Sequence, residues 1–306
     1  MHCWFGNIVV GTVIGFAALV ADQAYGNPIS SDADSLVADA PIPHWMDDYG
    51  QAMRTAEATD SMLLVFFKGE GKNPYREYFE YQAANDPDIR RKLAEYVLVQ
   101  VPKDAKIVSQ GQDVPLLGHG AFSELAGREG LAIIDLANRD KDYYGHVVSV
   151  FPLVPGRYYR YQPNHLRVML DLPSGTLTQR TMIFAVRIHP EAPASTNGEL
   201  DTVLIDEANS HSAYQAQIRV QGHHRWGERF QRLLGRLPRG LHAQEVVAES
   251  WPHEDVVDAA VDCVDCWRQS SGHWSAVRAP QPRFGYDMRR GSNGIWYATG
   301  LFGNNH

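Results

Sequence analysis

Short apolar runs and longer amphipathic stretches alternate through the first half of this chain. The apolar runs predict buried strands, and they are Met62–Phe67, Val97–Val101, Leu131–Leu136 and His146–Phe151. The amphipathic stretches predict helices, and they are Asp47–Ala58, Pro74–Ala84, Asp86–Tyr96 and Asn164–Leu172. Pro74 suits a first helical turn, where its missing N–H has no helical partner to lose. Helices and strands that interleave in this way predict an α/β fold.

The second half has a different pattern. Thr181–Ile188 is rich in apolar and β-branched residues and predicts a strand, which the Pro190 region ends. The rest of this half predicts, in chain order, helical structure over 200–234 interrupted near Gly222 and Gly227, a strand-like run Leu241–Val247, a helix Val256–Trp267, a Ser270–His273 turn, and two strands joined by the loop Gly291–Gly294.

The N-terminus predicts an export signal. Ile8–Ala21 is uncharged and apolar, but is shorter than the roughly 20 residues that span a bilayer as a helix. Small residues follow it at Ala24 and Gly26, as at a signal-peptidase site, although the first seven residues contain no Lys or Arg. We therefore expect a cleaved signal over 1–26, a polar linker over 27–44 and no transmembrane helix after cleavage. The expected location is secreted, or periplasmic and cell-envelope.

Length and charge limit the classes to which this protein can belong. The 306 residues favour two domains, and a hydrophobic content of 44% with 21% charged residues is that of a globular chain. The formal net charge of −8 argues against a nucleic-acid partner, which would require clustered Lys and Arg.

The C-terminal motifs resemble those of a known superfamily. Trp267-Arg268-Gln269-Ser270-Ser271-Gly272-His273 is followed by Phe284-Gly285-Tyr286 and by Tyr297 to Phe302-Gly303. These motifs resemble the end of a CAP-superfamily domain (cysteine-rich secretory, antigen 5, pathogenesis-related 1) in its bacterial secreted form. The resemblance implies a CAP-like α-β-α sandwich over 177–306. It does not imply a reaction, because one fold hosts many activities.

The order of elements over 45–176 resembles a thioredoxin-like domain. That family carries two cysteines just after the strand that corresponds to Met62–Phe67, whereas this chain has Lys68–Tyr75 there, without cysteine. The family's cis-proline is also replaced, by Arg128-Glu129-Gly130. Without a thiolate no disulfide exchange can occur, so we expect no redox site in this domain.

Cys263 and Cys266 are the only cysteines that follow the expected signal. They lie within the predicted helix Val256–Trp267, where an i,i+3 pair strains disulfide geometry, and they precede its C-terminal end rather than following an N-terminus that would activate a thiol. We therefore expect buried, unreactive thiols.

The CAP resemblance implies a cleft lined by two histidines and two acids, which in some members hold a divalent metal. His273 corresponds to the second histidine, and either His223 or His224, with a preference for His224, corresponds to the first. Glu249 corresponds to the first acid, with Glu245 as an out-of-register alternative. The second acid is absent, because Ser270 occupies its position.

His224, Glu249 and His273 would still provide the three protein ligands of an open zinc site. No cofactor is assured beyond this candidate divalent metal. The favoured function is a non-catalytic binding or structural protein of the cell envelope or exterior, whose partner is an unidentified small ligand or envelope component. The alternative is a metal-dependent hydrolase acting from the His/Glu cleft. A serine hydrolase is disfavoured because the chain has no Gly-x-Ser-x-Gly motif.

Overall fold

The structure is a computed structural model, and it describes residues 40–109, 111–154 and 162–305. The predicted signal peptide, 1–26, and most of the predicted linker lie outside these residues. Within them, no helix is both long enough and apolar enough to cross a membrane.

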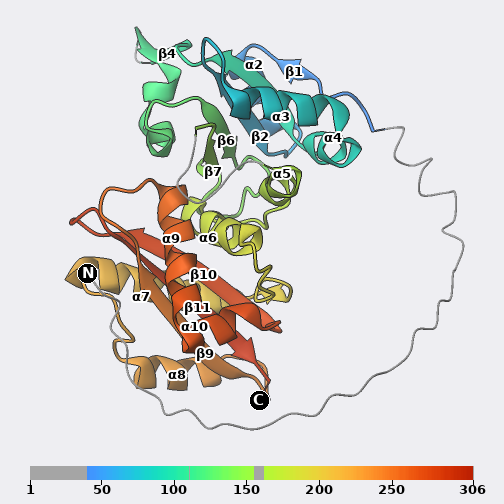
Figure 1. The fold of residues 1–306 in the computed structure, drawn as a ribbon. Coiled ribbons are helices and arrows are strands. Elements are labelled where there is room, and N and C mark those ends of the chain that lie inside the picture. Colours follow the sequence, from blue (N-terminus) through green and yellow to red (C-terminus); the bar gives the residue numbers. More distant parts are fainter. Residues whose placement is uncertain (1–39, 110, 155–161, 306) are drawn as a thin grey trace, which may run out of the picture.

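The chain forms an α/β structure in which helices and strands interleave (Figure 1). The elements of the first half are β1 (Trp45–Met46), α2 (Tyr49–Ala58), β2 (Leu63–Lys68), α3 (Pro74–Asn85), α4 (Pro87–Leu93), β3 (Val97–Pro102), β4 (Lys106–Ser109), β5 (Gln112–Pro115), the 3₁₀ turns Leu116–Gly118 and Gly120–Leu125, β6 (Gly130–Ile134), β7 (Val147–Pro152) and α5 (Pro163–Leu170). Those of the second half are α6 (Leu177–Ile188), β8 (Glu199–Leu200), α7 (Thr202–Ile218), α8 (Trp226–Leu234), β9 (His242–Glu249), α9 (Val256–Gln269), α10 (Ser271–Arg278), β10 (Arg283–Arg290) and β11 (Trp296–Asn304).

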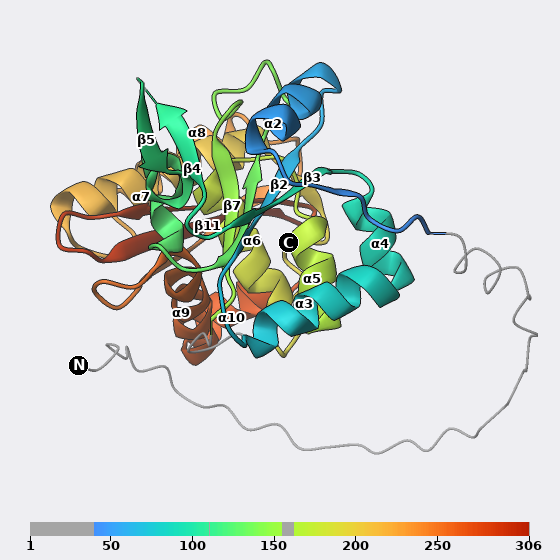
Figure 2. The same cartoon turned by 90° about the horizontal axis from the view of Figure 1, so that it is seen from above.

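The first half is built on a five-stranded sheet of order β1-β3-β2-β6-β7. Strand β2 pairs in parallel with β3 and antiparallel with β6, so Val65 lies between Val99 and Ala132. All of its residues from Leu63 to Phe67 are buried, as the continuous apolar run predicts. A separate hairpin, β4–β5, was not predicted, and it lies at the opposite end of this half from α4 (Figure 2).

Two helices of this half begin at an Asx-Pro pair. The Asn73 side chain accepts from the N–H groups of Tyr75 and Arg76, and the Asp86 side chain caps α4 in the same way. In each case proline occupies the first helical position, where no donor is needed. The predicted starts of both helices are confirmed.

The strand predicted over Thr181–Ile188 is wrong, because this segment belongs to helix α6. Thr176 and Gln179 form a reciprocal capping box that starts the helix. Ten of its twelve residues are buried, since α6 lies between the two halves of the molecule and contacts both. The β-branched residues of Thr181–Ile188 favour a strand in the sequence, and packing between the two halves overrides that preference.

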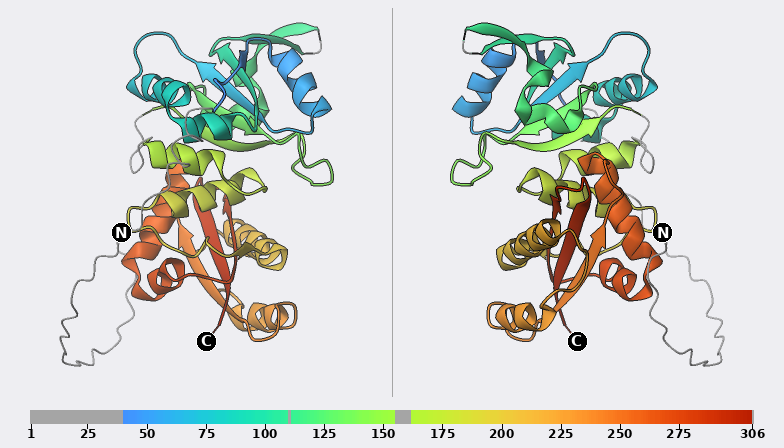
Figure 3. Two further views of the ribbon diagram at one scale, coloured as in Figure 1. Left: turned by 90° about the vertical axis from the view of Figure 1, so that its right-hand side faces the viewer. Right: turned by 90° about the vertical axis from the view of Figure 1, so that its left-hand side faces the viewer.

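The second half is built on a four-stranded sheet of order β8-β10-β11-β9. Strands β10 and β11 form the predicted hairpin, with Tyr286 opposite Gly300. Helices α7 and α8 cover one face, and α9 and α10 cover the other (Figure 3). Gly285 permits the close approach of α7, because a Cβ there would meet the backbone N of Ile205 at 2.5 Å.

The apolar core is continuous from the first sheet to the second. Phe184 of α6 packs edge-on against Phe151 of β7, with ring centroids 5.0 Å apart. In the second half, Trp267 of α9 lies 5.7 Å from Tyr286 of β10. An ion pair also connects the two halves. Arg128 of the first half lies 2.8 Å from Asp255, the N-cap of α9.

Two details of the second half differ from the sequence prediction. The interruption of the helical stretch 200–234 near Gly222 is confirmed, but the one predicted near Gly227 is wrong, because Gly227 lies inside α8. His273, predicted in a turn, lies in the first turn of α10, a helix whose existence was not predicted. Ser270 alone separates α9 from α10, so one residue links two helices where the sequence predicted a turn.

Candidate functional site

The candidate site is built on β9, the edge strand of the second sheet. Its residues alternate between the two faces, which directs Glu245 toward α7 and α8 while Val246 faces α9. The Glu245 side chain is 1% exposed. A carboxylate at this depth requires charged or hydrogen-bonding partners.

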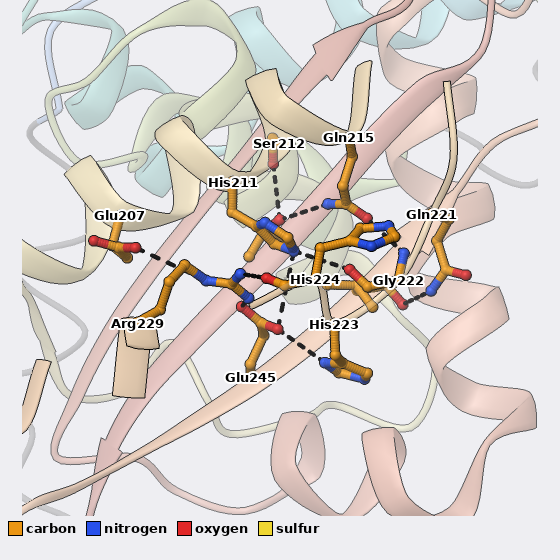
Figure 4. A network of polar contacts seen from close by, with 12 residues as sticks. Glu207, His211, Ser212, Gln215, Gln221, Gly222, His223, His224, Arg229 and Glu245 are labelled. Atoms are coloured by element: carbon orange, nitrogen blue, oxygen red, sulfur yellow. Dashed lines mark hydrogen bonds and ion pairs between the residues drawn. The ribbon is translucent and has the colours of Figure 1, made fainter. Parts of the chain in front are cut away.

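Arg229 of α8 is the principal partner of this carboxylate. Its Nη2 forms an ion pair with Glu245 Oε2, and its Nε lies 3.8 Å from Glu207 Oε1 of α7. Its Nη1 donates to the carbonyl oxygen of His224 (Figure 4). Arg232, at the surface, completes the group with a 2.6 Å contact to Glu207. The buried charges of this cluster therefore occur in opposite-sign pairs.

The other oxygen of Glu245 orients the first histidine. His223 Nδ1 lies 2.8 Å from Glu245 Oε1. Because a carboxylate only accepts, Nδ1 carries the proton and Nε2 of the neutral ring is an acceptor. That Nε2 lies 3.2 Å from Nε2 of His273, which then donates to it. Glu245, His223 and His273 therefore form one connected series from the buried strand to the surface.

Long-range contacts hold the loop that carries His223. Gln215 of α7 accepts from the N–H of Gly222 at 3.0 Å, and His211 Nε2 contacts the Gly222 carbonyl oxygen at 3.0 Å. Gln221 donates to the carbonyl oxygen of Val247 at 3.3 Å (Figure 4). The loop is thus attached both to α7 and to the edge of β9, which brings His223 around that edge to α10.

Burial shifts the protonation of two of these histidines. Desolvation lowers the pKa of His211 to about 4, so its ring is neutral at pH 7 and donates to Gly222. Desolvation, followed by the neighbouring His223, also lowers the pKa of His273, while Glu245 opposes that shift. Both rings therefore resist protonation in the folded protein.

Acid should destabilise the fold through His211. Between pH 6.5 and about 4 the unfolded chain takes up a proton at this ring and the folded protein does not. The free energy of unfolding should therefore fall as the pH decreases through this window. Urea unfolding at a series of pH values measures the slope, and His211→Gln, which keeps a donor for Gly222, should make it shallower. An unchanged slope in the variant would contradict the assignment.

His224, the preferred first histidine, does not reach His273. Its Nε2 contacts the carbonyl oxygen of Val220 at 3.2 Å, and its ring packs edge-on to Tyr214. There it lines a pocket of about 170 Å³ between α7 and α8. Adjacent residues of this irregular loop point in different directions, and the structure selects His223 for the cleft.

Glu249 is likewise not the acid beside His223. It follows Glu245 by four residues on the same face of β9, which places it about 13 Å farther along the strand. It is exposed, at the end of β9 opposite Tyr297 of β11. The out-of-register candidate Glu245 contacts His223, and α8 supplies its partner Arg229 at that point of the strand and not at Glu249.

Ser270, which replaces the missing acid, has a backbone role at the helix junction. Its N–H donates to the carbonyl oxygen of Trp267, and its own carbonyl oxygen accepts from Trp274, at 3.1 and 2.8 Å. These contacts end α9 and begin α10, which positions His273 beside the edge of β9. Ser270 itself is half-buried.

The predicted zinc ligands His224, Glu249 and His273 are not assembled. Across residues 40–109, 111–154 and 162–305, no three His, Cys, Asp or Glu side chains are arranged to hold a metal ion. The 3.2 Å separation of His223 Nε2 and His273 Nε2 does suit two ligands of one tetrahedral ion, for which about 3.3 Å is expected. Both oxygens of Glu245 are already engaged, so the cleft offers two of the three protein donors of a catalytic zinc site.

Only one of the two thiols is buried as predicted. Cys263 is fully buried, and burial raises its thiol pKa well above the usual value, which makes it a poor nucleophile. Cys266 is partly buried rather than buried, and its Sγ lies 3.9 Å from the carbonyl oxygen of Glu249. Both lie on α9, and neither forms a disulfide within the described residues.

A polar network occupies the loop between β2 and α3, where the sequence contains no cysteine. Glu129 Oε2 accepts from the Gly69 N–H at 2.8 Å and from Arg76 Nη1 at 3.0 Å. Its Oε1 accepts from the Asn73 side chain, so the residue that caps α3 also contacts this carboxylate. The sequence identified this loop as lacking a thiol but did not predict its ion pair.

Comparison with known proteins adds little to this geometry. No family model matches the chain, and no curated protein matches it either. Among solved structures, an outer surface protein from Borrelia burgdorferi is similar over 36% of this chain and 78% of its own, with 17% sequence identity and a TM-score of 0.29.

Proposed function

We propose that this protein is an exported binding or structural protein of the cell envelope or exterior, and that the His223–His273 pair, held by Glu245, is its ligand-facing element. Its partner would be a small ligand or an envelope component. The expected signal peptide supports export.

The fold supports the two resemblances on which this proposal draws. In the first half the β4–β5 hairpin and two 3₁₀ turns are inserted between β3 and β6. Apart from them, the order of helix, strand, two helices and strand, then two antiparallel strands and a helix, agrees with a thioredoxin-like domain that lacks its cysteines. In the second half, helices lie on both faces of the sheet, as expected of a CAP-like sandwich. The His223–His273 pair connects the loop before α8 to α10 across one edge of that sheet.

One observation carries the binding role. The groups beneath the cleft are buried and charge-paired, whereas the His223 side chain above them is 44% exposed. Glu245 and Arg229 therefore orient a solvent-facing imidazole pair. Orientation from a buried partner is what binding and catalytic histidines share.

A metal-dependent hydrolase is the second candidate, and the imidazole nitrogen separation favours it. A metal held by His223 and His273 would have Glu245 as the outer partner of the first ligand, and would act as a Lewis acid when bound. It would need a third protein donor, and no described His, Cys, Asp or Glu is arranged with the pair to supply one. A site with only these two protein donors should bind a metal ion weakly.

Zinc binding and hydrolysis separate the two candidates. Equilibrium dialysis of the purified protein against Zn²⁺ should give no stoichiometric tight site, and a panel of ester, peptide and phosphoester substrates should give no turnover that depends on His273. One equivalent of zinc that is lost in His273→Ala, together with turnover lost in the same variant, would replace the binding proposal by the hydrolase. His224→Ala is the matched control, because it removes a neighbouring histidine outside the cleft.

A further inference from the structure

The charge of this acidic protein is unevenly distributed. The segment Arg225–Arg239 contains five arginines and one acid, Glu228, which gives +5 − 1 = +4. The chain as a whole has a formal charge of −8, so the remainder carries −12. A segment of one sign on a body of the other produces a field that orients the molecule toward an anionic partner.

The structure separates these arginines into two groups. Arg229 is buried and Arg232 is at the surface, and they are paired with the buried carboxylates of Glu245 and Glu207 respectively. Arg225, Arg236 and Arg239 are exposed, and no described residue forms an ion pair with any of them. The Arg225 guanidinium instead lies over the Tyr214 ring, 5.9 Å from its centroid.

The exposed arginines lie at the two ends of α8. Arg225 is the N-cap residue of the helix, and Arg236 follows shortly after its last residue, Leu234, while the arginine within its first turns, Arg229, is buried. Arg239 follows in the turn after α8. The apolar face of the helix is already covered, because Leu233 and Leu237 are buried in a core with Leu204 and Leu301. The groups that α8 and its ends expose to a partner are therefore charged side chains rather than an apolar face.

We propose that Arg225, Arg236 and Arg239 form a docking surface for the headgroups of an anionic lipid membrane. Helix α8 lies at the periphery of the molecule, away from the first half (Figure 1). Its apolar side is buried in the protein, so the contact is electrostatic, peripheral and reversible. The strongly negative remainder of the chain is repelled by the same surface and so turns this end toward it. Trp226, partly exposed beside Arg225, would lie at headgroup level.

Vesicle co-sedimentation tests the proposal. At low salt the protein should bind vesicles of phosphatidylcholine mixed with phosphatidylglycerol, but not vesicles of phosphatidylcholine alone. The variant Arg225→Gln/Arg236→Gln/Arg239→Gln should bind about one hundredfold more weakly, since each basic residue near such a surface contributes about a fivefold factor. Raising the salt concentration should release the wild-type protein, because the contacts are exposed.

A control of equal charge change is Arg54→Gln/Arg91→Gln/Arg278→Gln, which alters three exposed arginines on α2, α4 and α10. This control should bind almost as well as the wild type, and both triple variants should keep the wild-type circular dichroism spectrum. Binding that is equally reduced in both variants would show that net charge alone is responsible, and would overturn the proposal. No wild-type binding to anionic vesicles, or binding to double-stranded DNA without binding to vesicles, would also overturn it. These readouts do not depend on the His223–His273 cleft.

Discussion

Replacing Arg229 by methionine is expected to lower the free energy of unfolding by about 3–5 kcal/mol, because it leaves a buried carboxylate without its cation. Glu245 is 1% exposed, and Arg229 is its closest charged partner. The same substitution removes the cation beside Glu207 and the donor to the His224 carbonyl oxygen. Urea unfolding monitored by tryptophan fluorescence measures the loss.

Arg232→Met is the matched control for this prediction. Arg232 also contacts Glu207, at 2.6 Å, but its side chain is 55% exposed, so its removal should cost less than about 1 kcal/mol. The double variant Arg229→Met/Glu245→Gln should recover part of the lost stability, because no buried charge is then unpaired. Equal losses in Arg229→Met and Arg232→Met would show that the Arg229–Glu245 pair does not support the fold.

Replacing Arg76 by methionine should produce a loss of similar size in the first half, about 3–4 kcal/mol. Arg76 and Glu129 form a 3.0 Å ion pair with side chains only 11% and 10% exposed. Arg76 also donates to the carbonyl oxygens of Gly69 and Gly71, so one side chain holds the loop between β2 and α3. Its loss should destabilise the protein and speed hydrogen exchange at the Gly69 amide.

Lys68→Met, at the end of β2 next to this loop, provides the comparison. Lys68 and Glu80 form a 2.6 Å ion pair, but both side chains are more than one third exposed, at 37% and 39%. Exposed pairs contribute about 1 kcal/mol or less. If Arg76→Met were no more destabilising than Lys68→Met, the contacts of Arg76 with Glu129 would not contribute to the stability of the fold beyond an exposed ion pair.

Local signals predicted several elements of the fold correctly. Asn73-Pro74 and Asp86-Pro87 define the starts of α3 and α4, because capping and proline act within one turn of the chain. The apolar run of β2 and the hairpin around Gly291–Gly294 were identified for the same reason. Each of these elements is defined by residues that are neighbours in the sequence.

Helix α6 was mispredicted because its environment is not local. Its segment Thr181–Ile188 packs between the two halves, and the β-branched residues of that segment also suit a strand. Its N-terminal capping box, Thr176 with Gln179, was present in the sequence as a helix signal. The β-branched content of Thr181–Ile188 outweighed that signal in the sequence interpretation, and packing reversed the preference in the structure.

The sequence alone determined which residue types compete for the cleft: two adjacent histidines, two glutamates four residues apart, and His273. Only the tertiary structure decided among them. Glu245 and Glu249 share one face of β9, and α8 brings Arg229 over the first of them. His223 rather than His224 reaches His273 because contacts from Gln215, His211 and Gln221 set the course of their loop. A side chain's direction in an irregular loop follows from such long-range contacts, which no local pattern encodes.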